Sequence, residues 1–177
     1  FRDQQLSEED HRRFARRFGD IVLNKFFKPV EGHPDIAEVR KEKNQEMNIG
    51  GGWHTDHSYD EEPALGSILV ARALPDAGGD TCFADLANAF DALSPGLQKT
   101  LEGLRAVHSN EHLYGEDGIY RKTDLSEQLG GMDRVGGAVH PIVIRHPDSS
   151  RKVLFVNPGH TIGIEGWSNE IGRASCW

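Results

Sequence analysis

Two side chains that could hold a metal ion stand one residue apart in the stretch GGWHTDHSYDEEP, residues 51–63. His54 offers an imidazole nitrogen and Asp56 offers a carboxylate. On an extended segment, residues i and i+2 point to the same side, so both groups could reach one ion. An imidazole and a carboxylate are two thirds of the two-histidine, one-carboxylate triad that leaves coordination positions open on Fe(II). The pattern indicates a metal site, but His-x-Asp alone is a weak signal because such short patterns arise often by chance.

The neighbouring residues allow a second interpretation of the same stretch. His57 could join His54 and Asp56 as a compact ligand set for zinc in a metallohydrolase. The additional upstream histidines that such sites generally show are lacking from this pattern. The acidic residues 60–62 are interpreted as supporting or surface groups, since one carboxylate suffices for the triad.

Helices and strands must position these groups, and the sequence signals several of both. Ser7 followed by three acids predicts a helix that ends near Gly19, and Asp85 and Ser94 have the character of caps for two more helices. Strands are predicted at 66–74, 81–84 and 105–110, with a hairpin formed by 141–145 and 152–157. The segments 29–52 and 110–137 are predicted as long loops, the second of them mobile. The pattern favours an α+β, mainly β domain built on an antiparallel sandwich or barrel.

Composition sets broad limits on function. The chain has 177 residues, enough for one domain with a core, and its net charge of −8 argues against nucleic acid or an anionic membrane as a partner. It shows no apolar run of the length that a membrane helix needs. Two cysteines do not make a disulfide framework, so we expect a reducing cytoplasm. A small-molecule substrate is the expected partner, and a homo-oligomer stays open.

A longer series of motifs gives the His-x-Asp pair a context. WHTD, GGDT, two HP pairs and LFVN follow one another in the chain, and this series resembles the TauD/TfdA family of Fe(II)- and 2-oxoglutarate-dependent dioxygenases. The resemblance covers residues 1–166, interpreted as a partial domain of that family. It implies a double-stranded β-helix core, a cupin-like jelly roll with flanking helices, here incomplete at both ends.

The resemblance also implies a chemistry. His54 and Asp56 match the family's iron ligands, and Thr81 of GGDT matches the residue that hydrogen-bonds a 2-oxoglutarate carboxylate. Fe(II), 2-oxoglutarate and O2 are the implied cofactor and co-substrates. The implied reaction hydroxylates a small organic substrate and releases succinate and CO2. A non-catalytic jelly-roll binding module that kept the fold and lost a ligand is the alternative from another functional class.

The sequence departs from the family in three places. The family's distal histidine ligand, and the arginine behind it that pairs with 2-oxoglutarate, have no counterpart in this chain, and we assign no ligand role to His140, His146 or His160. Gly50 stands where several members carry a polar side chain that reads the substrate, so no substrate is named. Residues 167–177 are expected to be a foreign tail resembling translated cloning sequence. We therefore expect this chain alone to bind iron weakly, to turn over nothing and to aggregate readily.

Overall fold

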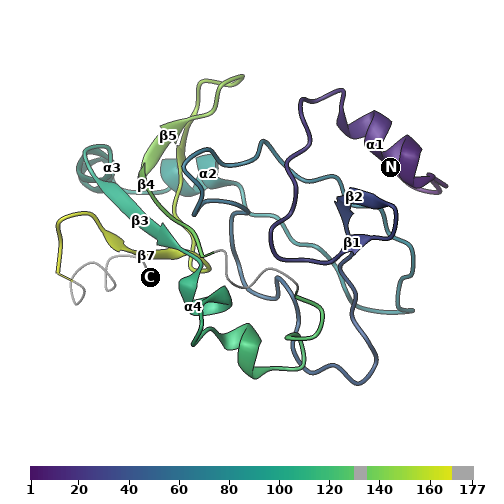
Figure 1. Cartoon of the computed structure of the whole chain (residues 1–177). Helices are drawn as coiled ribbons and strands as arrows, with labels where there is room; N and C mark the ends of the chain where they lie inside the picture. Colours follow the sequence, from purple (N-terminus) through teal and green to yellow (C-terminus); the bar gives the residue numbers. More distant parts are fainter. Residues whose placement is uncertain (130–134, 169–177) are drawn as a thin grey trace. The chain divides into compact units, whose positions relative to one another are not determined.

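The computed structural model describes residues 1–129 and 135–168, which divide into two compact units (Figure 1). The first, called the α1 unit, comprises residues 1–49, 64–79 and 113–129. The second, called the sheet unit, comprises residues 50–63, 80–112 and 135–168. The expected tail at 167–177 falls mostly outside the described residues. None of the helices in the described residues combines the length and apolar character needed to cross a membrane.

The α1 unit begins with the helix that the sequence predicted. Helix α1 (Glu8–Ala15) starts in a capping box, in which the Ser7 hydroxyl accepts from the backbone of Asp10 and the Asp10 carboxylate accepts from that of Ser7. It ends before Gly19, because the next turn tightens into bonds from Arg17 to Phe14 and from Phe18 to Ala15. A short antiparallel pair follows, made of β1 (Pro29–Val30) and β2 (His33–Ala37). The predicted loop 29–52 therefore contains a hairpin.

The core of the α1 unit is aromatic. Phe26 is 2% exposed, and its ring stacks on Tyr114 with centroids 4.1 Å apart, while Tyr120 meets Tyr114 edge-on at 5.3 Å. Leu125 and Leu129 are also buried. The described part of the predicted loop over 110–137 is not irregular throughout, because it contains α4 (Glu111–Tyr114) and the 3-10 helix η1 (Ile119–Lys122). The apolar side chains spread through this polar stretch are what anchor it.

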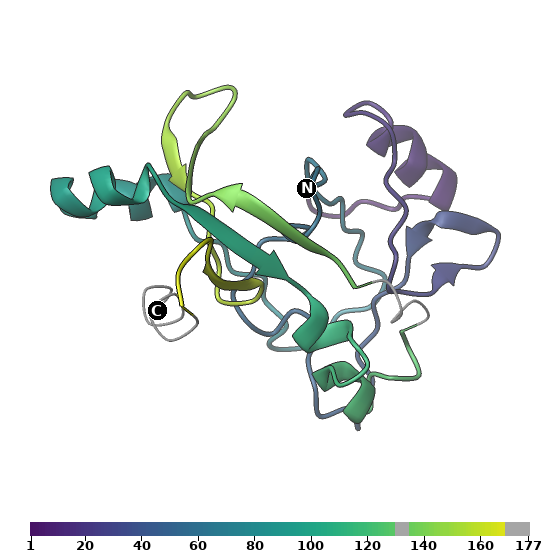
Figure 2. The same ribbon diagram turned by 60° about the vertical axis from the view of Figure 1, so that its left-hand side comes forward.

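The sheet unit is built on a three-stranded antiparallel sheet of order β4-β3-β7 (Figure 2). Its strands are β3 (Arg105–Ser109), β4 (Gly137–Pro141) and β7 (Thr161–Ile164). The predicted hairpin is confirmed as β5 (Val143–Arg145) and β6 (Lys152–Leu154), which pair antiparallel. The helices α2 (Leu86–Asp91) and α3 (Pro95–Leu101) begin at the predicted caps, Asp85 and Ser94. Ala106, Ile142 and Ile164 form the apolar core. The partly buried side chains that pack against it are Leu101, Leu104, Val143, Leu154 and Val156.

Two predicted strands are wrong. Residues 66–74 and 81–84 are extended coil, and Leu69, Leu74 and Phe83 are 79%, 79% and 90% exposed. A strand needs a neighbour that completes its hydrogen-bond ladder, and within the described residues no strand pairs with either segment. The apolar pattern of these segments favours strands, but a strand also needs a pairing partner, and neither segment has one in the described residues. For the same reason the described residues form small sheets and no closed barrel.

Candidate functional site

His54 and Asp56 come together in the sheet unit. The Nε2 atom of His54 lies 3.2 Å from an Oδ1 atom of Asp56, and the two side chains are 33% and 60% exposed. Residues 53–55 have no regular secondary structure and a turn begins at Asp56, so the two groups meet at the start of a turn and not along a strand. Their role as ligands of one ion stays a prediction.

The tautomer of His54 is fixed by the chain just before it. The Nδ1 atom lies 2.8 Å from the carbonyl oxygen of Gly52, and a carbonyl only accepts, so Nδ1 carries the proton. In the neutral ring Nε2 then presents a lone pair toward the Asp56 carboxylate. Two acceptors 3.2 Å apart repel each other, so this arrangement favours a cation between them. In the metal-free chain that cation is a proton, and the hydrogen bond with Asp56 raises the pKa of the His54 imidazole against the opposing effect of burial.

The donor set also fits a metal ion. Neighbouring ligands about 2.1 Å from one octahedral ion lie roughly 3 Å apart, close to the separation of these two atoms. Imidazole nitrogen and carboxylate oxygen are two of the three ligands in the facial triad of non-haem iron sites. Within residues 1–129 and 135–168, no group of three histidines, cysteines or acids is arranged to hold a metal ion. The site therefore offers two protein ligands in the described part of the chain.

The turn that follows Asp56 is held on both sides. His57 has a left-handed backbone, φ 59°, and its Nδ1 atom bonds to the Asp60 carboxylate at 2.8 Å. Such a conformation is costly for a residue other than glycine, so the surrounding contacts must enforce it. The Nε2 atom of His140 on β4 lies 3.0 Å from the backbone oxygen of Asp60 and fastens the turn to the sheet. His57 faces Asp60, and its side chain does not join His54 and Asp56 in a compact zinc set.

Beneath the pair lies a cluster of buried polar side chains that the sequence did not single out as functional. It comprises Ser58, His108, Asn110, Asn157 and His160, all at most 8% exposed. The ring of His160 meets that of Tyr59 at 4.7 Å and that of His54 at 6.1 Å, edge-on in both cases. Burial, supported by the nearby His54 and His112, lowers the pKa of His160 to about 4, so the imidazole is neutral. A histidine directly after a predicted strand, in VNPGHT, was the available signal.

His160 is close to the pair without being a third ligand. Its Nδ1 atom is buried and has no hydrogen-bond partner among the described residues. The centroid separation of 6.1 Å from His54 is that of an edge-on aromatic contact, and the ring is not part of any metal-holding group in the described chain. The absence of a ligand role for His140, assigned from the sequence, agrees with its bond to Asp60.

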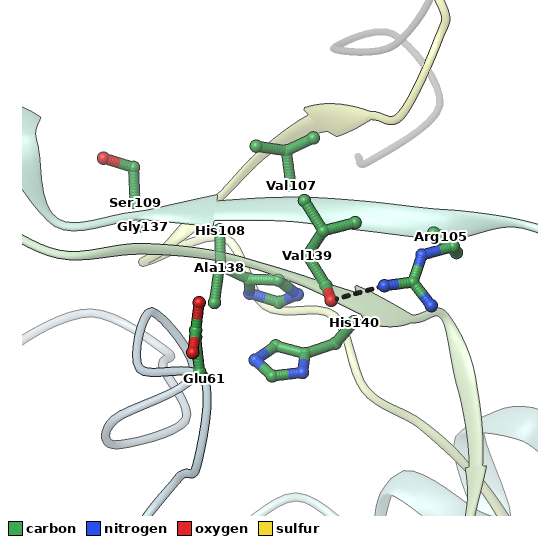
Figure 3. Close-up of a pocket in the computed structure, with 9 residues that line it drawn as sticks. All are labelled: Glu61, Arg105, Val107, His108, Ser109, Gly137, Ala138, Val139 and His140. Atoms are coloured by element: carbon green, nitrogen blue, oxygen red, sulfur yellow. Dashed lines mark hydrogen bonds between the residues drawn. The ribbon is translucent and has the colours of Figure 1, made fainter.

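A hollow of about 520 Å³ opens along β3 and β4 of the same unit (Figure 3). Figure 3 shows Glu61, His108 and His140 among the residues that line it, and the Arg105 side chain hydrogen-bonded to the Val139 carbonyl, at 2.9 Å. Burial, together with the nearby His140, lowers the pKa of His108 to about 4. Neither His54 nor Asp56 lines this hollow.

Thr81, the predicted 2-oxoglutarate contact, lies on exposed coil between residues 80 and 85. No hydrogen bond joins it to His54 or Asp56 in the part of the chain that the structure describes. The structure brings together the two predicted metal ligands, and Thr81 stays a prediction that rests on the GGDT motif alone.

Comparisons with known proteins identify the family of the chain. The family described as taurine catabolism dioxygenase TauD, TfdA family matches residues 1–175. An alpha-ketoglutarate-dependent 2,4-dichlorophenoxyacetate dioxygenase from Cupriavidus pinatubonensis is 35% identical, over 98% of this chain and 64% of that protein. A crystal structure of a taurine dioxygenase from Burkholderia xenovorans superposes with a TM-score of 0.75 at 30% identity, over 99% of this chain and 55% of the other.

A third relative was solved with ligands. The structure of AAD-2 in complex with Mn(II) and N-oxalylglycine superposes with a TM-score of 0.69 at 28% identity, over 99% of this chain and 60% of that one. The chain spans between 36% and 64% of the length of the curated relatives it matches.

Proposed function

The chain belongs to the TauD, TfdA family of taurine catabolism dioxygenases, and we propose that the protein is an Fe(II)- and 2-oxoglutarate-dependent dioxygenase. Its substrate would be a small organic molecule, hydroxylated at a C–H bond with O2 as oxidant. One oxygen atom enters the alcohol product, and the other enters succinate as 2-oxoglutarate loses CO2. A jelly-roll core and a cytoplasmic location are part of the same proposal. The jelly roll is supported by the likeness to the taurine dioxygenase structure.

The observation that carries the proposal is the acceptor pair of His54 Nε2 and Asp56 Oδ1, 3.2 Å apart on an exposed turn. Bound Fe(II), with 2-oxoglutarate and O2, would supply the oxidising chemistry. The chain's own part is to present the two ligands in fixed orientations. The Gly52 carbonyl holds the His54 proton on Nδ1 and so keeps Nε2 available. The bond between His57 and Asp60 holds the turn from which the Asp56 carboxylate projects.

Thr81 is proposed to donate its hydroxyl to a carboxylate of 2-oxoglutarate. The match to the family motif GGDT supports this role, and the exposed position of Thr81 leaves the hydroxyl accessible to a ligand. The Mn(II) and N-oxalylglycine named for AAD-2 support a divalent ion and a dicarboxylate as the ligands of this fold.

The 177-residue chain by itself is proposed to bind Fe(II) weakly and to make no succinate from 2-oxoglutarate. The reason is the ligand count, because two protein ligands in the described residues leave the ion with fewer anchors than the triad provides. Reading the source gene beyond the codon for Gly166 would test this. An open frame that encodes a histidine, with an arginine shortly after it, would support the proposal, whereas succinate production by the 177-residue chain would refute it.

Metal binding tests the site directly. Mn(II) titrated into the chain, followed by electron paramagnetic resonance, should show binding that Asp56→Ala weakens at least tenfold. Asp148→Asn, on the exposed turn between β5 and β6, removes one carboxylate elsewhere and should leave binding unchanged. Equal affinities for Asp56→Ala and the original chain would show that the carboxylate ligand is misassigned.

A further inference from the structure

The connection between β6 and β7 lies against the backbone that carries His54. A Cβ atom added at Gly159 would stand 2.7 Å from the Cβ of His54 and 3.1 Å from the backbone oxygen of Trp53. Contacts below 3.0 Å do not occur between real Cβ atoms and their neighbours. Both opposing atoms belong to or adjoin the backbone, so no side-chain rotation can relieve the contact. Only glycine permits this approach.

Asn157, two residues earlier, ties the same connection to the turn behind Asp56. Its Nδ2 donates to the hydroxyl of Ser58 at 3.2 Å, and its Oδ1 accepts from the backbone of His160 at 2.8 Å. Asn157 is 8% exposed and Ser58 is fully buried, so these bonds form away from water. Buried hydrogen bonds of this kind fix relative positions, because breaking one leaves an unsatisfied polar group.

We propose that Gly159 and Asn157 are positioning residues that set the orientation of His54 toward Asp56. Gly159 supplies a flat backbone surface against which the His54 Cβ rests, and Asn157 holds that surface in place through Ser58. The inference deepens the proposed function, since it treats His54 and Asp56 as a metal-binding pair. Its physical content, the orientation of one imidazole, can be measured without a metal.

Gly159 provides an unusually clean test. Its backbone is outside the left-handed region, so the substitution to alanine acts through the contacts of the added Cβ, which lie at 2.7 Å from the His54 Cβ, 3.1 Å from the Trp53 oxygen and 3.4 Å from Asn157 Oδ1. Two other glycines serve as matched controls. Gly163 on β7 has nothing within 4 Å of an added Cβ, and Gly118 in the α1 unit would meet the backbone oxygen of Leu113 at 2.5 Å.

The readout is the ring tautomer of His54, observed by long-range ¹H–¹⁵N correlation in the metal-free chain, at a pH above which the His54 ring signals no longer change. The His54 signals are assigned by their loss in His54→Gln. The original chain should show one tautomer with the proton on Nδ1, as the bond to Gly52 requires. Gly159→Ala should give a mixture of tautomers. Gly163→Ala should change nothing, and Gly118→Ala should lower the melting temperature without altering the His54 signals.

Two further measurements keep the inference falsifiable. Asn157→Ala should also mix the tautomers, and in the original chain Mn(II) affinity should exceed that of Gly159→Ala by about tenfold. If Gly159→Ala fails to fold, Asn157→Ala decides by the same spectra. A His54 tautomer unchanged in these variants would overturn the positioning role. If the tautomer shifts as expected and Mn(II) does not bind the original chain, the positioning role stands and the proposed metal function falls.

Discussion

The two units bury different kinds of side chain. The core of the α1 unit consists of aromatic and aliphatic groups, among them Phe26, Tyr114 and Leu125. The sheet unit also has a small apolar core, around Ala106 and Ile164, but in addition it contains every buried polar or charged residue of the described chain. Three of them, Ser58, Asn157 and His160, lie in or against the turn that follows His54.

The two kinds of buried side chain have different roles: apolar groups stabilise the fold, and hydrogen-bonded polar groups fix the positions of particular atoms. Apolar burial stabilises a fold without specifying where any one polar atom lies, because it is non-directional. Buried hydrogen bonds add little net stability, yet each has a required partner and geometry. In the α1 unit, burial therefore contributes stability and does not fix the position of particular polar atoms. The sheet unit also fixes the orientation of particular atoms, which is what a metal or co-substrate site requires.

The largest expected effect on stability comes from removing the side chain at the centre of the aromatic core. Phe26→Ala should lower the free energy of unfolding in urea by about 3 to 5 kcal/mol, since it leaves a cavity beneath the stacked ring of Tyr114. Phe83→Ala, at a side chain 90% exposed, is the matched control and should change stability little. Phe26→Leu, a milder truncation, should retain the fold and the single His54 tautomer. Equal effects at positions 26 and 83 would show that the aromatic core is misidentified.

An intermediate effect is expected from acid, which should lower the free energy of unfolding through the buried histidines of the sheet unit. His108 is wholly buried beside His140, and its folded pKa of about 4 lies below the ordinary 6.5 of the unfolded chain. The unfolded state therefore binds more protons between these values. The free energy of unfolding is therefore unaffected by His108 above pH 6.5. It falls by about 2 to 3 kcal/mol as the pH decreases from 6.5 toward 4, because protonation of His108 favours the unfolded state. His160 should contribute in the same direction.

Urea unfolding at several pH values between 4 and 7 measures this slope. His108→Leu should flatten it, whatever the variant does to stability at pH 7, because leucine binds no proton. A slope equal to that of the original chain would mean that His108 is not held neutral by its surroundings.

The smallest effect is expected at two residues of the sheet unit that have a left-handed backbone conformation. Ser150 has φ 56° in the exposed turn between β5 and β6, and Ser150→Gly should stabilise the chain by about 0.5 to 1 kcal/mol by relieving backbone strain. His57→Gly relieves similar strain but loses the bond to Asp60, so it should give no gain. Thermal unfolding of both variants, with Ser149→Gly as a control, checks the comparison. A gain at His57 would show that the bond to Asp60 does not stabilise the turn.

Much of the local structure was predictable from the sequence. The caps at Ser7, Asp85 and Ser94 and the hairpin of β5 and β6 depend on residues near one another in the chain, and each formed where expected. His54 and Asp56 also come together, but at the start of a turn and not on the extended segment that the spacing argument assumed. The predicted strands at 66–74 and 81–84 failed because pairing depends on a partner that periodicity does not identify.

The support of the site could not be predicted for a related reason. Nothing in the spacing of Asn157 or Gly159 indicates that they lie against Trp53 and Ser58, because that contact arises from the fold. His160 was visible as a histidine, but only burial shows that it is held neutral. The sequence therefore indicated His54 and Asp56 as a candidate pair, and the structure was needed to find the residues that lie against it.

The hydrogen bond between Ser58 and Asn157 joins residues 99 positions apart, and this has a consequence for synthesis of the protein. A nascent chain that already contains His54 and Asp56 has no Asn157 or Gly159 until about a hundred more residues have been added. At typical translation rates this takes roughly 5 to 20 seconds. During that interval the two ligands are present without the segment that orients them. We therefore expect any metal affinity of the pair to arise only after the segment with Asn157 and Gly159 has folded against it.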